Sequence, residues 1–278
     1  MKKISRRSFL AAAGLSVAAL ALTACGGSAS SVASSVASSA SSAAASTSAA
    51  AGELTTVEAG KLTMATNAAF PPYEMTTDAG DFEGIDIETA QAIADKLGLE
   101  LQIDDMDFDA ALLSVQQGKA DIVMAGVTVT DERKAVMDFS DSYATGIQSI
   151  IVPEGSDITS PDDLAGKKIG TQRGTTGYIY CSDDFGDENV VAYDNGLTAV
   201  QALNNGQVDA VVIDNAPAQE FVAANPGLKV LDTSYAEEDY AIGMAKGSAL
   251  EDAVNKALEE LKADGTLQSI VDKYINAN

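Results

Sequence analysis

One short sequence motif occurs twice, and it restricts the possible fold more than any other feature. Gly118-Lys-Ala-Asp121-Ile-Val123 returns as Gly206-Gln-Val-Asp209-Ala-Val211. Each copy follows an amphipathic segment and precedes a polar loop, so each predicts a helix that ends at glycine and then a buried strand. Helices that alternate with buried strands are typical of α/β layers. The recurrence therefore predicts two similar α/β lobes.

Hydrophobic periodicity elsewhere in the chain predicts the other helices and strands of these lobes. Apolar residues at helical spacing predict a helix over 86–97, ended by Gly98, and a second over 109–117. Short apolar runs predict strands over 61–65, 122–125 and 210–213. We expect 146–152 and 240–244 to be strands that cross between the lobes, and helices over 248–262 and 266–275 to pack on the first lobe.

The N-terminus predicts export and anchoring. Four basic residues precede an apolar run over 9–22 that is too short to span a bilayer. The pair Arg6-Arg7 resembles a twin-arginine signal, but it also fits the general secretory route. Leu22-Thr-Ala-Cys25-Gly26 resembles a lipobox, which implies that 1–24 are removed and Cys25 is lipidated; the alternative is an incidental cysteine. The Ser/Ala-rich composition of 25–53 predicts a disordered linker.

Charge and composition exclude several classes of function. All 41 acidic residues follow position 52, while four of the 17 basic residues lie in the first seven positions. So acidic a body is an implausible partner for nucleic acid. The chain has no histidine, which removes histidine-based triads and metal sites. Cys181 is the only cysteine of the body, and we interpret it as an inert, partly buried thiol.

Three features could bind a small charged ligand. Thr130 caps a short helix in which Arg133 lies in the first turn, where a cation opposes the helix dipole. Either Asp131 or Glu132 pairs with it at the surface, or it binds an anion. Lys168 to Gly177 reads as a strand, a glycine-flanked turn and a helix whose N–H groups, near Thr176, could also receive an anion.

Asp214 ends a buried strand, a position that faces the crevice of an open α/β sheet, although the same residue could simply cap the next helix. Phe70 and Phe108 lie on loops, where they either pack in the core or form a stacking wall. A cation at Arg133, an anion at Asp214 and N–H groups at Thr176 together complement a zwitterion such as a free amino acid.

The chain resembles the polar amino-acid-binding proteins of ABC importers over nearly everything after residue 54. The residues that carry the resemblance are Ala65-Thr-Asn67-Ala-Ala-Phe70-Pro-Pro-Tyr, Phe82-Glu-Gly84-Ile-Asp86, Ala125-Gly126-Val-Thr128-Val-Thr130-Asp-Glu-Arg133 and Asp138-Phe-Ser140. It implies an α/β fold of periplasmic binding protein type II, with two Rossmann-like lobes joined by a two-strand hinge. The implied lobes are 54–147 plus 239–278, and 148–238.

The resemblance also implies a ligand and the residues that bind it. Arg133 holds the α-carboxylate with the N–H groups of Thr128 and Thr176, while Asp214, the Gly126 carbonyl and the Thr128 hydroxyl hold the ammonium. Asn67, Phe70, Phe108 and Gln172 surround the ligand's side chain. Relatives often carry aspartate in place of Asn67, which argues against lysine or arginine as ligand; Asp86 leaves basic ligands open.

The implied function is that of a lipid-anchored protein that captures a polar L-amino acid and delivers it to a permease, whose ATPase lies on the cytoplasmic side. Neither a cofactor nor a metal is expected, and no catalytic residue. One alternative is an enzyme of the same fold, such as a dehydratase of cyclic amino acids. A second is an amino-acid sensor, which would normally carry a transmembrane helix.

Overall fold

A computed structural model of the chain describes residues 54–275. The predicted export signal, the lipobox with Cys25 and the whole of the Ser/Ala-rich linker lie outside the described residues. Within the described part, none of the helices combines the length and the apolar character that a membrane crossing requires.

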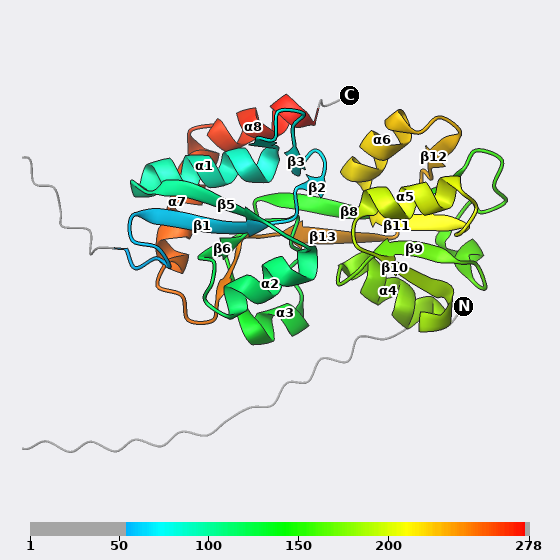
Figure 1. The fold of residues 1–278 in the computed structure, drawn as a ribbon, viewed down its shortest axis with the longest axis horizontal. Coiled ribbons are helices and arrows are strands. Elements are labelled where there is room, and N and C mark those ends of the chain that lie inside the picture. The colour runs from blue at the N-terminus through cyan, green and yellow to red at the C-terminus, as the bar shows by residue number, and fades with distance from the viewer. Residues whose placement is uncertain (1–53, 276–278) are drawn as a thin grey trace, which may run out of the picture. The chain divides into compact units, whose positions relative to one another are not determined.

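The first sheet has five strands in the order β5-β1-β6-β14-β7 (Figure 1). Its strands are β1 (Lys61–Thr66), β5 (Glu100–Asp105), β6 (Ile122–Val123), β7 (Met137–Phe139) and β14 (Gly243–Ala245). Its helices are α1 (Ile85–Leu97), α2 (Phe108–Gln116), α3 (Asp131–Val136), α7 (Glu251–Ala263) and α8 (Thr266–Tyr274). Strand β1 is parallel to β5 and β6, whereas β14 runs antiparallel to β6 and β7.

Alternation along β1 places helices on both faces of this sheet. Leu62 and Met64 are fully buried in a cluster with apolar residues of α1, α7 and α8. Ala65 points the opposite way, into a cluster with Ala111 and Val115 of α2. The C-terminal helices therefore pack on the first lobe as predicted, although α7 begins at Glu251 rather than at Ser248.

A small sheet follows β1 and is formed by β2 (Ala69–Phe70), β3 (Glu74–Thr76) and β4 (Phe82–Glu83). The strands are antiparallel, with Phe70 opposite Glu74. Gly84, which follows β4, adopts a φ of 131°, and an added Cβ there would lie 2.2 Å from the Tyr73 carbonyl oxygen. Glycine is thus required where the chain turns from β4 into α1.

The second sheet has the order β10-β9-β11-β8-β12, with β13 also paired to β8. Its strands are β8 (Ala144–Pro153), β9 (Ile169–Gln172), β10 (Val190–Tyr193), β11 (Ala210–Asp214), β12 (Leu228–Val230) and β13 (Ala236–Tyr240). Its helices are α4 (Thr176–Phe185), α5 (Gly196–Asn204) and α6 (Asn215–Ala224), with short 3₁₀ turns η1 (Pro161–Leu164) and η2 (Asp187–Asn189). Val211 and Ile213 face α5 and α6, while Ala210 and Val212 face α4.

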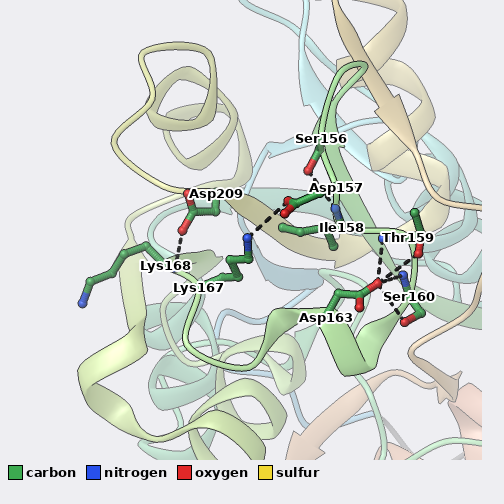
Figure 2. Close-up of polar contacts among 9 residues, drawn as sticks. All are labelled: Ser156, Asp157, Ile158, Thr159, Ser160, Asp163, Lys167, Lys168 and Asp209. Atoms are coloured by element: carbon green, nitrogen blue, oxygen red, sulfur yellow. Dashed lines mark hydrogen bonds and ion pairs between the residues drawn. The ribbon is translucent and has the colours of Figure 1, made fainter.

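The repeated sequence motif occupies equivalent positions in the two sheets. In the first, the Asp121 carboxylate accepts hydrogen bonds from the N–H groups of Val57 (2.7 Å) and Thr63 (2.8 Å). In the second, Asp209 accepts one from the N–H of Lys168 (2.7 Å), as Figure 2 shows. Each aspartate precedes the third strand of a β-α-β-α-β unit and fixes the start of the first strand. The sequence repeat therefore corresponds to a structural repeat.

A second group of contacts in Figure 2 fixes the connection from β8 to β9. One oxygen of Asp163 accepts hydrogen bonds from the backbone N–H groups and hydroxyls of Thr159 and Ser160, which forms a capping box at the start of η1. Lys167 pairs with Asp157 at 3.2 Å. Local polar contacts thus hold this loop without a large core of its own.

The prediction for one crossing strand is wrong. Strand β8 includes 146–152, but 240–244 is divided: β13 ends at Tyr240 and β14 begins at Gly243. The polar run over 236–239 forms most of β13 because its backbone pairs with β8, from Ala236 opposite Gln148 to Tyr240 opposite Ala144. The backbone hydrogen bonds of a ladder do not depend on side-chain polarity, so an acidic run can form a strand when a partner is present.

Candidate ligand-binding cleft

A cleft of about 440 Å³, including the part open to solvent, is lined by residues of both sheets. Many of its lining residues follow the carboxyl ends of parallel strands, which is where open α/β sheets bind ligands. All nine residues predicted to contact a ligand line it: Asn67, Phe70, Phe108, Gly126, Thr128, Arg133, Gln172, Thr176 and Asp214.

Arg133 is directed into this cleft rather than toward a surface partner. The Thr130 hydroxyl caps α3 by accepting from the Arg133 N–H at 3.2 Å, as predicted. The guanidinium donates to the carbonyls of Thr128 (2.8 Å) and Gly174 (3.1 Å) and lies 5.4 Å from the Phe108 ring centroid. Among the described residues no carboxylate forms an ion pair with it. The alternative of a surface pair with Asp131 or Glu132 is therefore wrong.

Burial leaves this guanidinium with unmet charge. Arg133 is 9% exposed, and desolvation lowers its pKa, an effect that the charge of Glu238 partly opposes. Two of its five N–H groups are used on neutral carbonyls. A carboxylate that entered the cleft could accept from the others and would supply the missing negative charge.

Asp214 both caps a helix and lines the cleft, so the two alternatives hold together. Its Oδ1 accepts from the N–H of Ala216 (3.0 Å) at the start of α6, and its Oδ2 accepts from the N–H of Ile147 (2.8 Å) in β8. The residue is 2% exposed, and burial raises its pKa to about 6. A cation in the cleft would offset the cost of keeping this carboxylate ionised.

Two threonines meet where the sheets approach each other. The Thr128 hydroxyl donates to Glu238 Oε2 at 3.0 Å and lies 3.4 Å from the Thr176 hydroxyl. Thr176 is the first residue of α4, so its N–H has no acceptor within the helix. The helix dipole adds a partial positive charge at this point. Arg133 and the start of α4 thus bring positive charge to this end of the cleft, beside the Glu238 carboxylate.

An amide pair links the ends of two equivalent strands. Asn67 follows β1, Gln172 ends β9, and Gln172 Nε2 donates to Asn67 Oδ1 at 2.9 Å. Asn67 Nδ2 donates to the Met106 carbonyl at 2.9 Å, which fixes the orientation of the amide. The pair contributes no charge to the cleft, and it connects the first sheet to the second.

Phe70 and Phe108 serve core and cleft at once. Phe108 is 6% exposed and packs with Ala111 and Val115, yet its ring also lines the cleft. Phe70 packs against the apolar clusters of both sheets and stacks on Tyr73, with ring centroids 5.7 Å apart. Both alternatives considered for these aromatic residues therefore apply.

Sequence reasoning did not identify several lining residues. Glu74, Gln148 and Tyr240 line the cleft, and Glu238 contacts the Thr128 hydroxyl and the Gln148 amide within it. Gln148 could have been found, because a polar residue interrupts an apolar strand there. Glu238 could not have been found from the sequence. In the run Glu237-Glu238-Asp239, nothing shows which side chain faces the cleft until the pairing of β13 is known.

Cys181 lies apart from the cleft. Its thiol is free and fully buried against β11, where it packs with Ala210 and Val212. Burial raises its pKa to about 12. A thiol with so high a pKa is a poor nucleophile, which fits the interpretation of an inert packing residue, although it is fully rather than partly buried.

Comparisons with known proteins decide the family. Residues 62–277 match the sequence model of the bacterial extracellular solute-binding proteins, family 3. The chain belongs to this family. A probable histidine-binding protein of Neisseria gonorrhoeae is 34% identical to this solute-binding protein over 272 residues, which cover 95% of this chain and 94% of the relative. The L-cystine-binding protein of Escherichia coli is 33% identical and covers 80% and 85%.

Solved structures agree with the fold. The arginine-, lysine-, histidine-binding protein of Geobacillus stearothermophilus is 34% identical, with a TM-score of 0.75 over 78% of this chain and 96% of that protein. This confirms the two-lobed α/β fold predicted from the sequence. Proteins of this family act outside the cytoplasm, and the relatives are binding proteins rather than enzymes. Their names differ in ligand, so family membership does not fix the ligand of this solute-binding protein.

Proposed function

We propose that the chain captures a free L-amino acid between its two lobes and delivers it to the permease of an ABC importer. The observation that carries this proposal is the convergence of Arg133 and Asp214 on one cleft. They come from different sheets, they carry opposite charges, and neither forms an ion pair with the other. A zwitterion matches both charges with one molecule.

In the proposed complex, the ligand carboxylate binds the Arg133 guanidinium and the N–H groups of Thr128 and Thr176. Its ammonium binds Asp214, the Gly126 carbonyl and the Thr128 hydroxyl. The ligand side chain lies among Asn67, Phe70, Phe108 and Gln172. Charge-assisted hydrogen bonds are worth about 1.5 to 3 kcal/mol each. Four or five of them could offset the cost of association and still give micromolar affinity.

Closure of the lobes over the ligand is the proposed signal to the transporter. The Arg133 guanidinium already donates to Gly174 of the second lobe, and Gln172 donates to Asn67 of the first. A ligand that adds bonds to both lobes stabilises this closed arrangement relative to an open one. We place the lobes at 54–147 plus 239–278 and at 148–238, with β8 and β13 as the connecting strands.

Delivery further requires that the protein stay near the membrane. We propose that Cys25 is lipidated after removal of residues 1–24 and that 25–53 tether the body to the cell membrane. A flexible linker of this length spans on the order of 25 to 30 Å. That reach would let the body meet a permease whose ATPase subunits lie on the cytoplasmic side.

A thermal-shift screen of the purified protein tests the capture of an amino acid. The panel contains the twenty amino acids, cystine and ornithine. Ligand at one hundred times its dissociation constant should add about 2.7 kcal/mol to the free energy of unfolding. For the best ligand, the N-acetyl derivative and the carboxamide each remove one charge, and both should abolish the shift. A folded protein that responds to no member of the panel would contradict the proposal.

A further inference from the structure

Glu238 is a buried carboxylate beside the cleft to which the proposed complex assigns no role. It is the third residue of β13, one of the two strands that connect the lobes, and it is 6% exposed. Its neighbours on the strand, Glu237 and Asp239, are both exposed. A buried carboxylate needs protein donors around it, because water no longer supplies them. The donors that Glu238 uses therefore indicate its role.

Three donors from different parts of the fold surround this carboxylate. The Thr128 hydroxyl and Gln148 Nε2 both donate to Glu238 Oε2 at 3.0 Å. The Tyr180 hydroxyl of α4 also contacts the carboxylate. The charges of Arg133 and Glu238 influence each other, but among the described residues Glu238 forms no ion pair. Hydrogen bonds rather than a paired cation thus hold the carboxylate in place.

Backbone bonds fix the distance between Glu238 and Thr128. The Val129 N–H donates to the Asp239 carbonyl at 3.0 Å, and the Ala241 N–H donates to the Val127 carbonyl at 3.1 Å. The end of β13 and the segment that contains Thr128 are therefore joined on both sides of the hydroxyl. The bond from the hydroxyl to the carboxylate does not depend on two mobile side chains that meet by chance.

The carboxylate decides where the hydrogen of the Thr128 hydroxyl points. A threonine hydroxyl has one hydrogen and two lone pairs, whereas a carboxylate only accepts. The hydrogen of Thr128 must therefore be directed at Glu238, which leaves the lone pairs of Oγ1 for other donors. The Thr176 hydroxyl, 3.4 Å away, is one such donor. In the proposed complex, the ligand's ammonium is another, and it has only hydrogens to offer.

We propose that Glu238 is a positioning residue that fixes the Thr128 hydroxyl as an acceptor for the α-ammonium of the ligand. This inference rests on the proposed function and adds a residue to its ammonium subsite. Without an acceptor at Glu238, the hydroxyl can turn its hydrogen toward the ammonium, so that donor faces donor. Glu238 acts through Thr128, and its effect is therefore the same for every amino acid, whatever the side chain.

Substitutions at Glu238 separate the direction of the hydroxyl from the effect of charge. Glu238→Met keeps the length of the side chain but accepts no strong hydrogen bond, so it should weaken amino-acid binding about tenfold or more. Glu238→Gln removes the charge but keeps a carbonyl oxygen that accepts from Thr128, so it should restore the affinity to within about threefold of the wild type. Glu237→Met, at the exposed neighbour on β13, is the matched control and should leave the affinity unchanged.

Calorimetry is carried out with L-arginine, L-histidine, L-glutamine and L-cystine, and with any other member of the amino-acid panel that stabilises the wild type. All of these probes carry an α-ammonium, so the loss in Glu238→Met should be the same for each one that binds. In a Thr128→Val background, Glu238→Met should cause less than about a twofold further loss, because no hydroxyl remains to be oriented. A residue that only supports the fold would cost the same affinity in both backgrounds.

Three results would overturn the proposal: no loss in Glu238→Met, equal losses in Glu238→Met and Glu238→Gln, or equal losses with and without the Thr128 hydroxyl. Neutron diffraction of wild-type crystals needs no variant and locates the deuterium of this hydroxyl directly. We expect it between Thr128 Oγ1 and Glu238 Oε2, and a deuterium directed at the ammonium of a bound amino acid would contradict the proposal. If no amino acid binds to the folded wild type, the proposed function itself fails, which is a different outcome.

Discussion

The two lobes share one scaffold but present opposite chemistry to the cleft. The first sheet orders its β-α-β-α-β unit as β5-β1-β6 and the second as β10-β9-β11, and an aspartate fixes the start of the first strand in each. After the third strand of the unit, the first lobe continues to Gly126, Thr128 and Arg133. In the second lobe, the equivalent strand, β11, ends at Asp214.

This difference shows how duplicated architecture can produce a site for an asymmetric ligand. The ends of the first strands carry like groups, Asn67 and Gln172, which bond to each other. Beyond the third strands the two lobes carry unlike charges, Arg133 and Asp214, and among the described residues neither forms an ion pair. A zwitterion is the simplest molecule that needs both, so it must contact both lobes.

Removal of Arg133 should give the largest effect on binding. We expect Arg133→Ala to weaken the best amino-acid ligand by about 3 kcal/mol or more, because the ligand carboxylate would be buried without its cation. Calorimetry measures the loss. Lys134→Ala is the matched control, since Lys134 is the exposed neighbour on the same helix. An unchanged affinity in Arg133→Ala would show that the first lobe does not bind the carboxylate.

The equivalent aspartates should differ in their importance for stability. Asp121→Ala leaves the N–H of Thr63, a residue that is 2% exposed, without an acceptor and should lower the free energy of unfolding by about 2 kcal/mol. Asp209 is exposed, so water can replace its oxygen, and Asp209→Ala should cost less than about 1 kcal/mol. Urea denaturation of both variants compares them. Equal losses would mean that burial does not separate the two lobes.

Acidity should weaken binding through the second lobe. Burial raises the pKa of Asp214 to about 6, so this carboxylate is mostly ionised at pH 7 and mostly protonated at pH 5 in the unliganded protein. A proton then competes with the ligand ammonium, and the affinity for a neutral amino acid should fall about tenfold, or roughly 1.4 kcal/mol, between pH 7 and pH 5. Asp214→Asn should bind weakly at both pH values and lose this dependence.

The same shift has the opposite sign for the stability of the empty protein. The folded-state pKa of Asp214 lies above the ordinary value of 3.8 for aspartate, so the folded state binds more protons than the unfolded state between about pH 4 and pH 6. The contribution of this group to stability is therefore present below that window and is lost as the pH rises through about 6. Ligand affinity and unliganded stability should move in opposite directions across the same interval.

Patterns of burial made the scaffold predictable, and pairing made parts of it unpredictable. Helix α1 was expected over 86–97 and occupies Ile85–Leu97, because its apolar residues recur on one face. Strand β13 was missed because it consists mainly of acidic residues whose strand character comes from β8. Local propensity contains no information about a partner that lies far away in the sequence.

The cleft shows the same limit at the level of single residues. Arg133 could be singled out because a cation in the first turn of a helix conflicts with the dipole, and that conflict is visible in the sequence. Glu74 shows no such conflict: its burial and its contact with the Asp86 carboxyl become apparent only when β3 is placed against the first lobe. The bond between Asn67 and Gln172 joins two lobes, so no local pattern could predict it.

That amide bond offers the finest test of how the lobes cooperate. Asn67→Ala and Gln172→Ala, made singly and together, form a double-mutant cycle in which the coupling measures the bond itself. A neutral hydrogen bond contributes about 0.5 to 1.5 kcal/mol, so the two substitutions together should cost less affinity than the sum of the single losses, by up to about 1 kcal/mol. Calorimetry with one ligand across the four proteins gives the coupling.

If the bond forms only when the lobes close, the coupling should appear in ligand affinity and be absent from the unfolding free energy of the empty protein. Coupling of equal size in both quantities would instead show that the amide pair holds the lobes together before any ligand arrives, and closure would then not depend on the unlike charges of the third strands.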